Sequence, residues 1–365
     1  MGVGFRQVPV DIYYFYALHH SDPPRHSFAC PFRRTERPPG QNQPLPTIEW
    51  QGGGLNINLR DPMYLGEPRV KEEAEEKSGK HSADSANSRP LPHGRPIALL
   101  EALWIAAELN MWHAGFAGKR SYYVVRERLA QAATGLAIRK HPLGDRLYIP
   151  PAYSEKNKEL CDAVRERFLH SLIPDDKRRR WYGFVVGFPR EADISRPGVV
   201  GLKLMHCPLT FWIDAKDWKS WSGRWSLKTL DRAACVLRVL GTEGERGSWI
   251  EVADIATIEL ADRHCWIPVH SEFERRLALK LVEERRAFRK PLEIELEEGQ
   301  PLLANFVLED RQDRCHLEIT GVLTGEDNPL ERMEKKALYE KMEQAVWWWN
   351  PMENETPPVL PPVVP

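Results

Sequence analysis

The sequence predicts an α+β protein of several domains, and three observations support this fold class. Its 365 residues exceed the length of one typical domain, which is roughly 150 residues. Hydrophobic residues make up 42% of the chain and aromatic residues 10%, enough for sizeable cores. Segments with helical spacing of apolar residues alternate with short apolar runs of strand type.

Composition restricts the class of function. The formal net charge is −1, so a nucleic-acid partner would have to be held by a local basic patch. The six cysteines are scattered singly, without a C-x-x-C pair, as is typical of free thiols in a reducing cytosol. No stretch approaches 18 apolar residues, so the sequence predicts no membrane span. We therefore expect a cytoplasmic protein without a membrane partner.

The first part of the chain is expected to be irregular. Residues 1–66 are rich in proline, with an aromatic strand candidate at 11–18. His26 and Cys30, together with two further histidines nearby, are residue types that bind zinc. Surface histidines in a loop are the alternative. Residues 67–96 combine charge, serine and proline with few large apolar residues, which predicts a flexible linker.

Residues 97–178 are expected to form a helical module. The run "PIALLEALWIAAELNMW" has apolar residues three and four apart, which predicts a helix. Glycines then separate it from a second helix, "SYYVVRERLAQAA", with Ser121 as N-cap and Gly135 as its end. This order resembles a helix-turn-helix.

The second helix of this module carries the candidate nucleic-acid contact. Residues 119–140 contain six Lys and Arg residues against one Glu, six minus one, a net charge of +5. Arg120, Tyr123 and Arg126 lie three apart and would share one face, which suits a phosphate backbone. A solvated basic helix face is the alternative. The predicted contact residues are Lys119, Arg120, Tyr123, Arg126 and Arg128.

Two further modules and a tail follow. Residues 179–265 contain several strand-like runs, interrupted by one helix expected at 226–241, and form a β-rich module. Residues 266–350 predict the order α-β-β-β-α-β. The helices of this order are expected at 271–288 and 328–346, and the first three strands at 291–298, 301–309 and 315–323. The proline-rich tail, 351–365, is expected to have no core to join.

The α-β-β-β-α-β order, and the acids within it, resemble the PD-(D/E)XK nuclease fold. In that fold a divalent metal such as Mg²⁺ or Mn²⁺ binds acids on adjacent strands, and a Lys steadies the attacking water. Glu318, in an apolar strand, matches the acid of the second half-motif. Glu272 or Glu274 matches the acid that some members carry on the first helix.

Two positions depart from the nuclease pattern. Asn305 stands where an Asp is expected, which should lower metal affinity, and Thr320 stands where the Lys is expected. Lys335 or Lys336, on the following helix, could replace the missing Lys. The alternative is that Glu318 is only a rim acid of a structural sheet.

Several stretches together resemble one family. They are "RHSFACPF", "EALWIAAELNMW", "AGKRSYYVVRERLAQAA", "LYIP" and "CWIPVHSEFERRL". They are similar to the bacterial family called domain of unknown function 1173, over about residues 15–350. The resemblance implies an association with plasmids and integrating conjugative elements. It implies no activity.

The sequence thus predicts a nucleic-acid-binding accessory protein of a bacterial mobile genetic element, with DNA and proteins of the same element as partners. Its nuclease-like domain would grip duplex DNA without cutting it, so the protein would not be an enzyme. Two alternatives stay open. One is an active metal-dependent nuclease that uses Glu318. The other is a protein-interaction scaffold that binds no nucleic acid.

Overall fold

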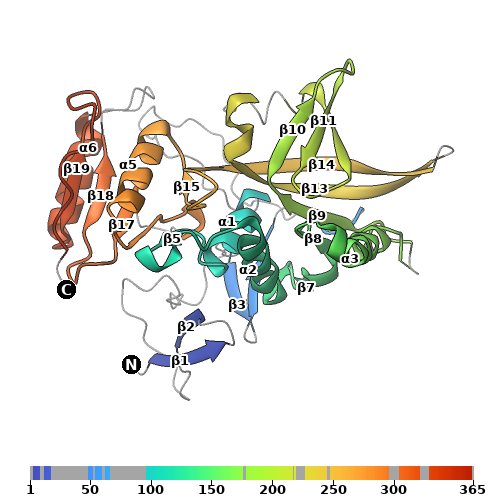
Figure 1. The fold of residues 1–365 in the computed structure, drawn as a ribbon, viewed down its shortest axis with the longest axis horizontal. Coiled ribbons are helices and arrows are strands. Elements are labelled where there is room, and N and C mark those ends of the chain that lie inside the picture. The colour runs from blue at the N-terminus through green and yellow to red at the C-terminus, as the bar shows by residue number, and fades with distance from the viewer. Residues whose placement is uncertain are drawn as a thin grey trace, which may run out of the picture. The chain divides into compact units, whose positions relative to one another are not determined.

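The chain forms two compact units, Met1–Gln43 and Pro44–Pro365. The computed structural model describes residues 3–8, 12–17, 48–51, 54–59, 62–65, 96–175, 178–216, 218, 227–244, 247–295, 304–320 and 329–363. The first unit contains an antiparallel hairpin of β1 (Val3–Val8) and β2 (Ile12–Ala17), and β2 coincides with the expected aromatic strand. The second unit combines helices with mixed sheets (Figure 1), which confirms the predicted α+β class.

Helix α1 (Pro96–Ala106) is buried around its whole circumference. It consists mainly of Ala and Leu, which are strong helix formers, and Pro96 takes the first helical position, where a missing N–H costs nothing. Leu99, Leu103 and Trp104 are fully buried. The helix packs against α2 and the large sheet. An apolar helix of this kind belongs in a core.

Helix α2 (Tyr122–Thr134) begins and ends where the sequence predicts. The hydroxyl of Ser121 accepts a backbone N–H of the first turn, and Gly135 is the C-cap. Val125 and Leu129 face the core.

The connection between α1 and α2 differs from a helix-turn-helix. Strand β5 (Met111–Trp112) and the 3-10 turn η1 (Ala114–Phe116) separate the two helices. Strand β5 pairs with β16 (Phe288–Arg289), far along the chain. The connection is therefore a sheet strand, because its backbone groups find their partners in another module.

A large mixed sheet follows, with the strand order β10-β11-β12-β14-β13-β9-β8, and β15 pairs with β14. Strands β13 and β14 form the long hairpin of Figure 1. The strands are β8 (Leu147–Tyr148), β9 (Tyr182–Gly187), β10 (Pro189–Asp193), β11 (Val199–Leu204), β12 (Thr210–Asp214), β13 (Ala233–Gly244), β14 (Gly247–Leu260) and β15 (Pro268–Val269).

Strand β13 corrects the helix expected at 226–241. The only helical part of that range is a 3-10 segment, η4 (Leu227–Arg232), among the residues that the structure describes. Val236 packs into the apolar cluster that contains α1, whereas Leu237 packs into the cluster on the other face. A strand buried on both faces reads as a continuous apolar run, which periodicity cannot distinguish from a buried helix.

Smaller elements surround this sheet. Helix α3 (Lys158–Ser171) packs on one face of the large sheet. A smaller sheet has the order β3-β4-β6-β7. These elements are β3 (Ile48–Gln51), β4 (Gly54–Ile57), β6 (Leu136–Ile138), β7 (His141–Pro142), α3 (Lys158–Ser171) and the 3-10 turns η2 (Gly144–Arg146) and η3 (Glu155–Asn157).

The C-terminal sheet has the order β19-β18-β17-β16-β5. Neighbours from β16 to β18 are antiparallel, and β18 and β19 are parallel. Along the chain the elements run α5-β16-β17-β18-α6-β19, the expected helix and strand order. The bounds are α5 (Glu272–Glu283), β17 (Phe306–Leu308), β18 (His316–Ile319), α6 (Pro329–Lys341), β19 (Val346–Trp349) and the 3-10 turn η5 (Glu293–Glu295).

Two details of this part differ from expectation. The first strand is Phe288–Arg289 rather than 291–298, because α5 ends early and Arg285 reverses the chain in the left-handed region, at φ 59°. The tail expected to join no core packs Leu360 into the C-terminal cluster. Its carbonyl groups accept hydrogen bonds from Arg286 and Arg311, as a polyproline backbone without internal hydrogen bonds allows.

The expected domain boundaries at 66, 96, 178, 265 and 350 stay predictions. One apolar cluster joins residues of α1 and α2 with residues of the large sheet. Within the described ranges, no helix combines the length and the apolar character that crossing a membrane requires.

Candidate functional site

Three of the predicted nuclease-like residues come together in the C-terminal sheet. Glu274 lies in the first turn of α5, Asn305 just before β17 and Glu318 in β18. The amide nitrogen of Asn305 donates to Glu274 at 2.7 Å. The amide oxygen of Asn305 accepts the backbone N–H of Ile319 at 2.8 Å. We call Glu274, Lys290, Asn305 and Glu318 the acid cluster.

Glu274 is a buried, ionised carboxylate. Its second oxygen accepts from the ammonium of Lys290 at 2.9 Å and from the backbone N–H of His270. Burial by itself would raise the pKa of Glu274, but Lys290 and His270 outweigh it and lower the pKa to about 2. Its position near the N-terminus of α5 also favours negative charge.

Glu318 is the most enclosed member, with 1% of its surface exposed. The hydroxyl of Tyr339 donates to it at 2.6 Å, and the ammonium of Lys335 lies 3.5 Å from its other oxygen. Burial raises the pKa of Glu318 despite the opposing effects of Lys335, Tyr339 and Lys290. Of the two lysines proposed to replace the missing motif Lys, Lys335 therefore reaches the acid. The side chain of Lys336 is 68% exposed and pairs with its own helix.

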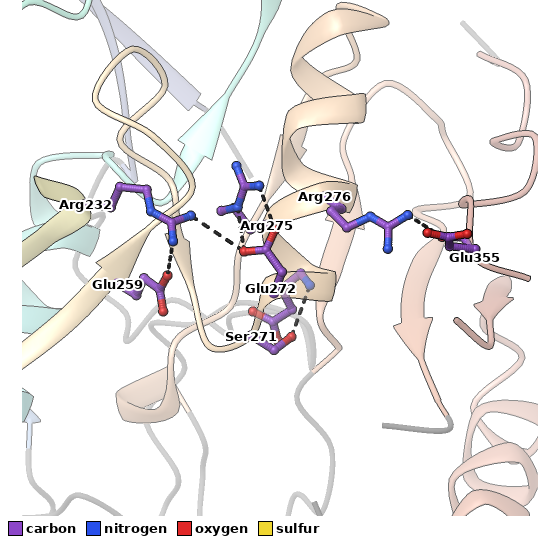
Figure 2. A network of polar contacts seen from close by, with 8 residues as sticks. Arg232, Glu259, Ser271, Glu272, Arg275, Arg276 and Glu355 are labelled. Carbon is purple, nitrogen blue, oxygen red and sulfur yellow. Dashed lines mark hydrogen bonds and ion pairs between the residues drawn. The ribbon is translucent and has the colours of Figure 1, made fainter. Parts of the chain in front are cut away.

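Glu272 lies outside the acid cluster. Figure 2 shows its carboxylate turned toward Arg232 and Arg275. Arg232 also pairs with Glu259 of β14, so this surface network links α5 to the large sheet. Glu274, and not Glu272, is the helix acid that meets the strand residues.

The acid cluster does not fit a divalent cation. Mg²⁺ and Mn²⁺ require several oxygen ligands that are free to coordinate. Both oxygens of Glu274 and both oxygens of Glu318 accept from neighbouring donors. Asn305 presents its NH₂ group to Glu274, because its oxygen faces a backbone N–H. Nowhere in the described part of the chain do three or more His, Cys, Asp or Glu side chains gather as metal ligands would.

A second cluster, of cations and rings, lies where η1 meets α2. We call His113, Phe116, Lys119, Arg120 and Arg128 the basic cluster. The guanidinium carbons of Arg120 and Arg128 lie 4.3 Å and 5.3 Å from the Phe116 ring centre, and the His113 ring stands 3.8 Å from it.

Arg120 holds this region together from inside. It precedes α2 and is 4% exposed, so it does not share a surface face with Tyr123 and Arg126 as the spacing suggested. Its guanidinium donates to carbonyl groups of Glu108, Met111 and Cys265. Burial lowers the pKa of Arg120, but a guanidinium remains charged at neutral pH.

Of the other predicted contact residues, two are exposed and two form hydrogen bonds within the protein. Lys119 is exposed, and Tyr123 is 61% exposed. Arg126 donates to the Ile149 carbonyl and to Glu127. Arg128 donates to the Ala107 carbonyl, and Glu108 lies 3.5 Å away. Their roles in nucleic-acid binding stay predictions.

The electrostatic character of the basic cluster is visible at His113. Burial lowers the pKa of His113, and the charges of Arg120, Arg128 and Lys119 lower it further. The imidazole is therefore neutral at physiological pH, in a local field of positive sign. Two of these cations, Arg120 and Arg128, lie near the carboxylate of Glu108.

The two clusters are joined through paired strands. Strand β5 leads into the basic cluster and pairs with β16, which leads into the acid cluster. Next to this pairing, the Lys290 N–H donates to the Asn110 carbonyl at 2.7 Å, and the Asn110 amide donates back to the Lys290 carbonyl at 3.0 Å. The basic cluster thus stands at the β5 edge of the C-terminal sheet.

Sequence reasoning missed Lys290 and Tyr339. Tyr339 follows Lys335 by four residues on α6, and residues at that spacing share a helix face, so this signal was present. Lys290 carried no such signal, because its strand was expected elsewhere. The predicted zinc ligands, His26 and Cys30, lie outside the described residues.

Comparison with known proteins gives a family. A family model described as "Protein of unknown function (DUF1173)" matches residues 24–352. The chain belongs to the DUF1173 family. No curated protein matches this DUF1173 protein. No solved structure matches it either.

Proposed function

We propose that this DUF1173 protein is a nucleic-acid-binding accessory protein that holds a DNA backbone without cutting it. The basic cluster would contact phosphates, and the C-terminal sheet would be a degenerate PD-(D/E)XK-like domain. Association with a bacterial mobile element, and with other proteins of that element, belongs to the same proposal.

The observation that carries the proposal is the position of the basic cluster at the edge of a sheet whose acids are already neutralised. Lys119, Arg120 and Arg128 carry three positive charges, and the two arginines lie near the carboxylate of Glu108. The exposed Lys119 and Tyr123 flank the N-terminus of α2, where backbone N–H groups favour a phosphate. A cationic patch of this kind suits sequence-independent backbone contact.

Cutting is disfavoured by the same geometry. Phosphodiester hydrolysis of the nuclease type needs carboxylates that hold a metal ion. Lys290 and Lys335 occupy Glu274 and Glu318 instead, and Asn305 bridges to Glu274 by a hydrogen bond. These contacts support the proposal that the domain resembles a nuclease in its arrangement of residues but does not bind the metal ion that cutting needs.

The proposal is tested by fluorescence anisotropy of an end-labelled duplex, with Mn²⁺ present, across a salt series. We expect a stable rise that falls with salt. Lys119→Ala combined with Tyr123→Ala should weaken binding several-fold and reduce the salt slope by about one phosphate contact. Lys336→Ala, which removes an exposed lysine of α6, is the matched control and should bind like the wild type.

Three outcomes would contradict the proposal. No rise at low salt would remove DNA binding and favour the scaffold. Binding that is unchanged in the double variant would remove the assigned surface. A signal that decays below the free-duplex value, and no longer does so in Glu318→Gln, would establish a nuclease.

A further inference from the structure

A pocket of about 520 Å³ lies beside α3, and neither cluster described above contributes to it. Its volume is within the range of roughly 300–1,000 Å³ that is common for small-ligand sites. Three segments enclose it: the chain around β8 and η3, the first two turns of α3, and the chain from β10 to the turn after β11. Its lining residues are Tyr148, Tyr153, Lys158, Cys161, Asp162, Arg165, Arg190, Met205, His206, Cys207 and Pro208.

The charge of the pocket favours an anion. Lys158, Arg165 and Arg190 stand against the single acid Asp162, three minus one, a net +2. Asp162 is already paired with Arg165 at 2.8 Å. Neither Lys158 nor Arg190 forms an ion pair with any residue that the structure describes. Both are exposed, so their charges remain available to a ligand.

The backbone directs two of the lining residues in unusual ways. Arg190 is the extra residue of a β-bulge, because Pro189 and Glu191 pair with consecutive residues of β11. Bulges re-aim a side chain and are frequent beside functional sites. His206 lies in the left-handed region at φ 55°, a conformation that non-glycine residues adopt rarely. Two irregularities therefore meet at one pocket.

His206 is held as a neutral donor. Its Nδ1 accepts the backbone N–H of Tyr153 at 3.1 Å, so the ring proton lies on Nε2. The Tyr122 ring packs against the imidazole, with centroids 4.4 Å apart. Burial, and then the charge of Arg190, lower the pKa of His206, which keeps the ring neutral at physiological pH.

The pocket also offers aromatic surface. Tyr153 is 45% exposed, and its hydroxyl is oriented by Glu155 at 2.9 Å. An exposed ring beside guanidinium groups is the combination that binds a base and its phosphate together. A simple inorganic anion would leave the ring and the Nε2 donor unused.

We propose that this pocket binds a nucleoside phosphate, with the phosphate at Arg165 and Arg190 and the base against Tyr153. His206 supplies a neutral hydrogen-bond donor. The ligand is either a free nucleotide or the phosphorylated end of a single strand, since both present the same chemistry. The inference stands apart from the basic cluster and does not require duplex binding there.

The test is calorimetric titration of the full-length protein with each of the four 2′-deoxynucleoside 5′-monophosphates. We expect saturable binding of at least one, and about tenfold weaker binding of the corresponding nucleoside, which lacks the phosphate. Arg190→Ala should weaken binding about tenfold. Arg196→Ala removes an exposed arginine that packs on Trp212 outside the pocket, and it should bind like the wild type.

The two ligand sources are separated by short single strands. A strand with a 5′-phosphate that binds more tightly than its 5′-hydroxyl form would identify a strand end. Equal strand affinities with tight mononucleotide binding would identify a free nucleotide. No heat with any mononucleotide at millimolar concentration would overturn the inference, and so would binding that Arg190→Ala and Lys158→Ala leave unchanged. Failure of duplex binding at Lys119 and Tyr123 would not affect this result.

Discussion

At position 305 an amide lies between the carboxylate of an N-terminal helix turn and the backbone of a strand. Only a group with both a donor and an acceptor can satisfy Glu274 and the Ile319 N–H at once. In a metal-dependent nuclease an acid at this place would face another acid, and the metal ion would hold them together. Asn305 makes the same link between α5 and β18 with hydrogen bonds alone.

The first prediction concerns Asn305→Asp. The new carboxylate would lose the donor to Glu274 and add like charge beside a buried acid. We expect the free energy of unfolding in urea to fall by roughly 2–4 kcal/mol at neutral pH. Asn354→Asp makes the same chemical change at an exposed position and should alter stability by less than about 0.5 kcal/mol. Equal stability of wild type and Asn305→Asp would refute the bridging role.

The meeting of Glu274, Asn305 and Glu318 could be anticipated from sequence because each sits at a recognisable point of a helix or strand. The pairing of Glu274 with Lys290 could not. Lys290 reaches Glu274 because it directly follows strand β16, which forms where the end of a helix and a turn were expected. The spacing of Arg120 predicted a surface position. The residue is buried instead, and its guanidinium donates to carbonyl groups outside α2. The local spacing of residues in the sequence carries no information about hydrogen-bond acceptors in other segments.

At the scale of elements, residues 226–241 were expected to form a helix, but they contain most of strand β13, which packs against α3 on one face. Strand β13 is enclosed on both faces, so its apolar residues are consecutive rather than alternating. By contrast, α2 carries local capping residues, Ser121 and Gly135, and was found with the correct bounds. Elements with local end signals were predictable. The strand conformation of β13, which is buried on two sides, was not.

The second prediction tests the α3–β13 contact. A Cβ at Gly241 would lie 2.8 Å from the Leu172 carbonyl oxygen, a backbone atom that cannot move alone. We expect Gly241→Ala to destabilise the fold by roughly 1–3 kcal/mol, because α3 must shift away from the sheet. A Cβ at Gly144 meets nothing within 4 Å, so Gly144→Ala is the matched control. Thermal unfolding followed by circular dichroism compares them, and equal midpoints would exclude close packing at Gly241.

At the scale of the whole second unit, helix α1 connects segments that were expected to belong to separate modules. Glu101 is buried in α1, and its carboxyl oxygen accepts the backbone N–H of Ile294 at 2.9 Å. The indole of Trp104 donates to the Trp266 carbonyl, across the expected boundary at 265. Such polar links in an apolar setting are costly when one partner changes charge, because the interior solvates charge poorly.

The third prediction follows from this setting of Glu101. Burial raises its pKa from 4.5 to about 8, and Glu293 and Glu295 add to the effect, while the Ile294 N–H and Lys290 oppose it. The folded protein therefore holds a proton that the unfolded chain releases near pH 4.5. A raised carboxyl pKa means that stability falls as pH rises from about 4.5 to about 8, and the loss is complete above that value.

Glu101→Gln keeps an acceptor for the Ile294 N–H and removes the titration. The free energy of unfolding of the variant, relative to the wild type, should therefore rise by a few kcal/mol between pH 5 and pH 9, as linkage requires for a shift of this direction. Urea unfolding at several pH values measures the difference. Glu340→Gln, whose side chain is 69% exposed, should show no such trend and controls for the loss of one carboxylate. If the Glu101→Gln difference stays constant across this range, Glu101 is ionised in the folded protein. In that case a cation must balance it, and Lys290 would then be shared between Glu101 and the acid cluster.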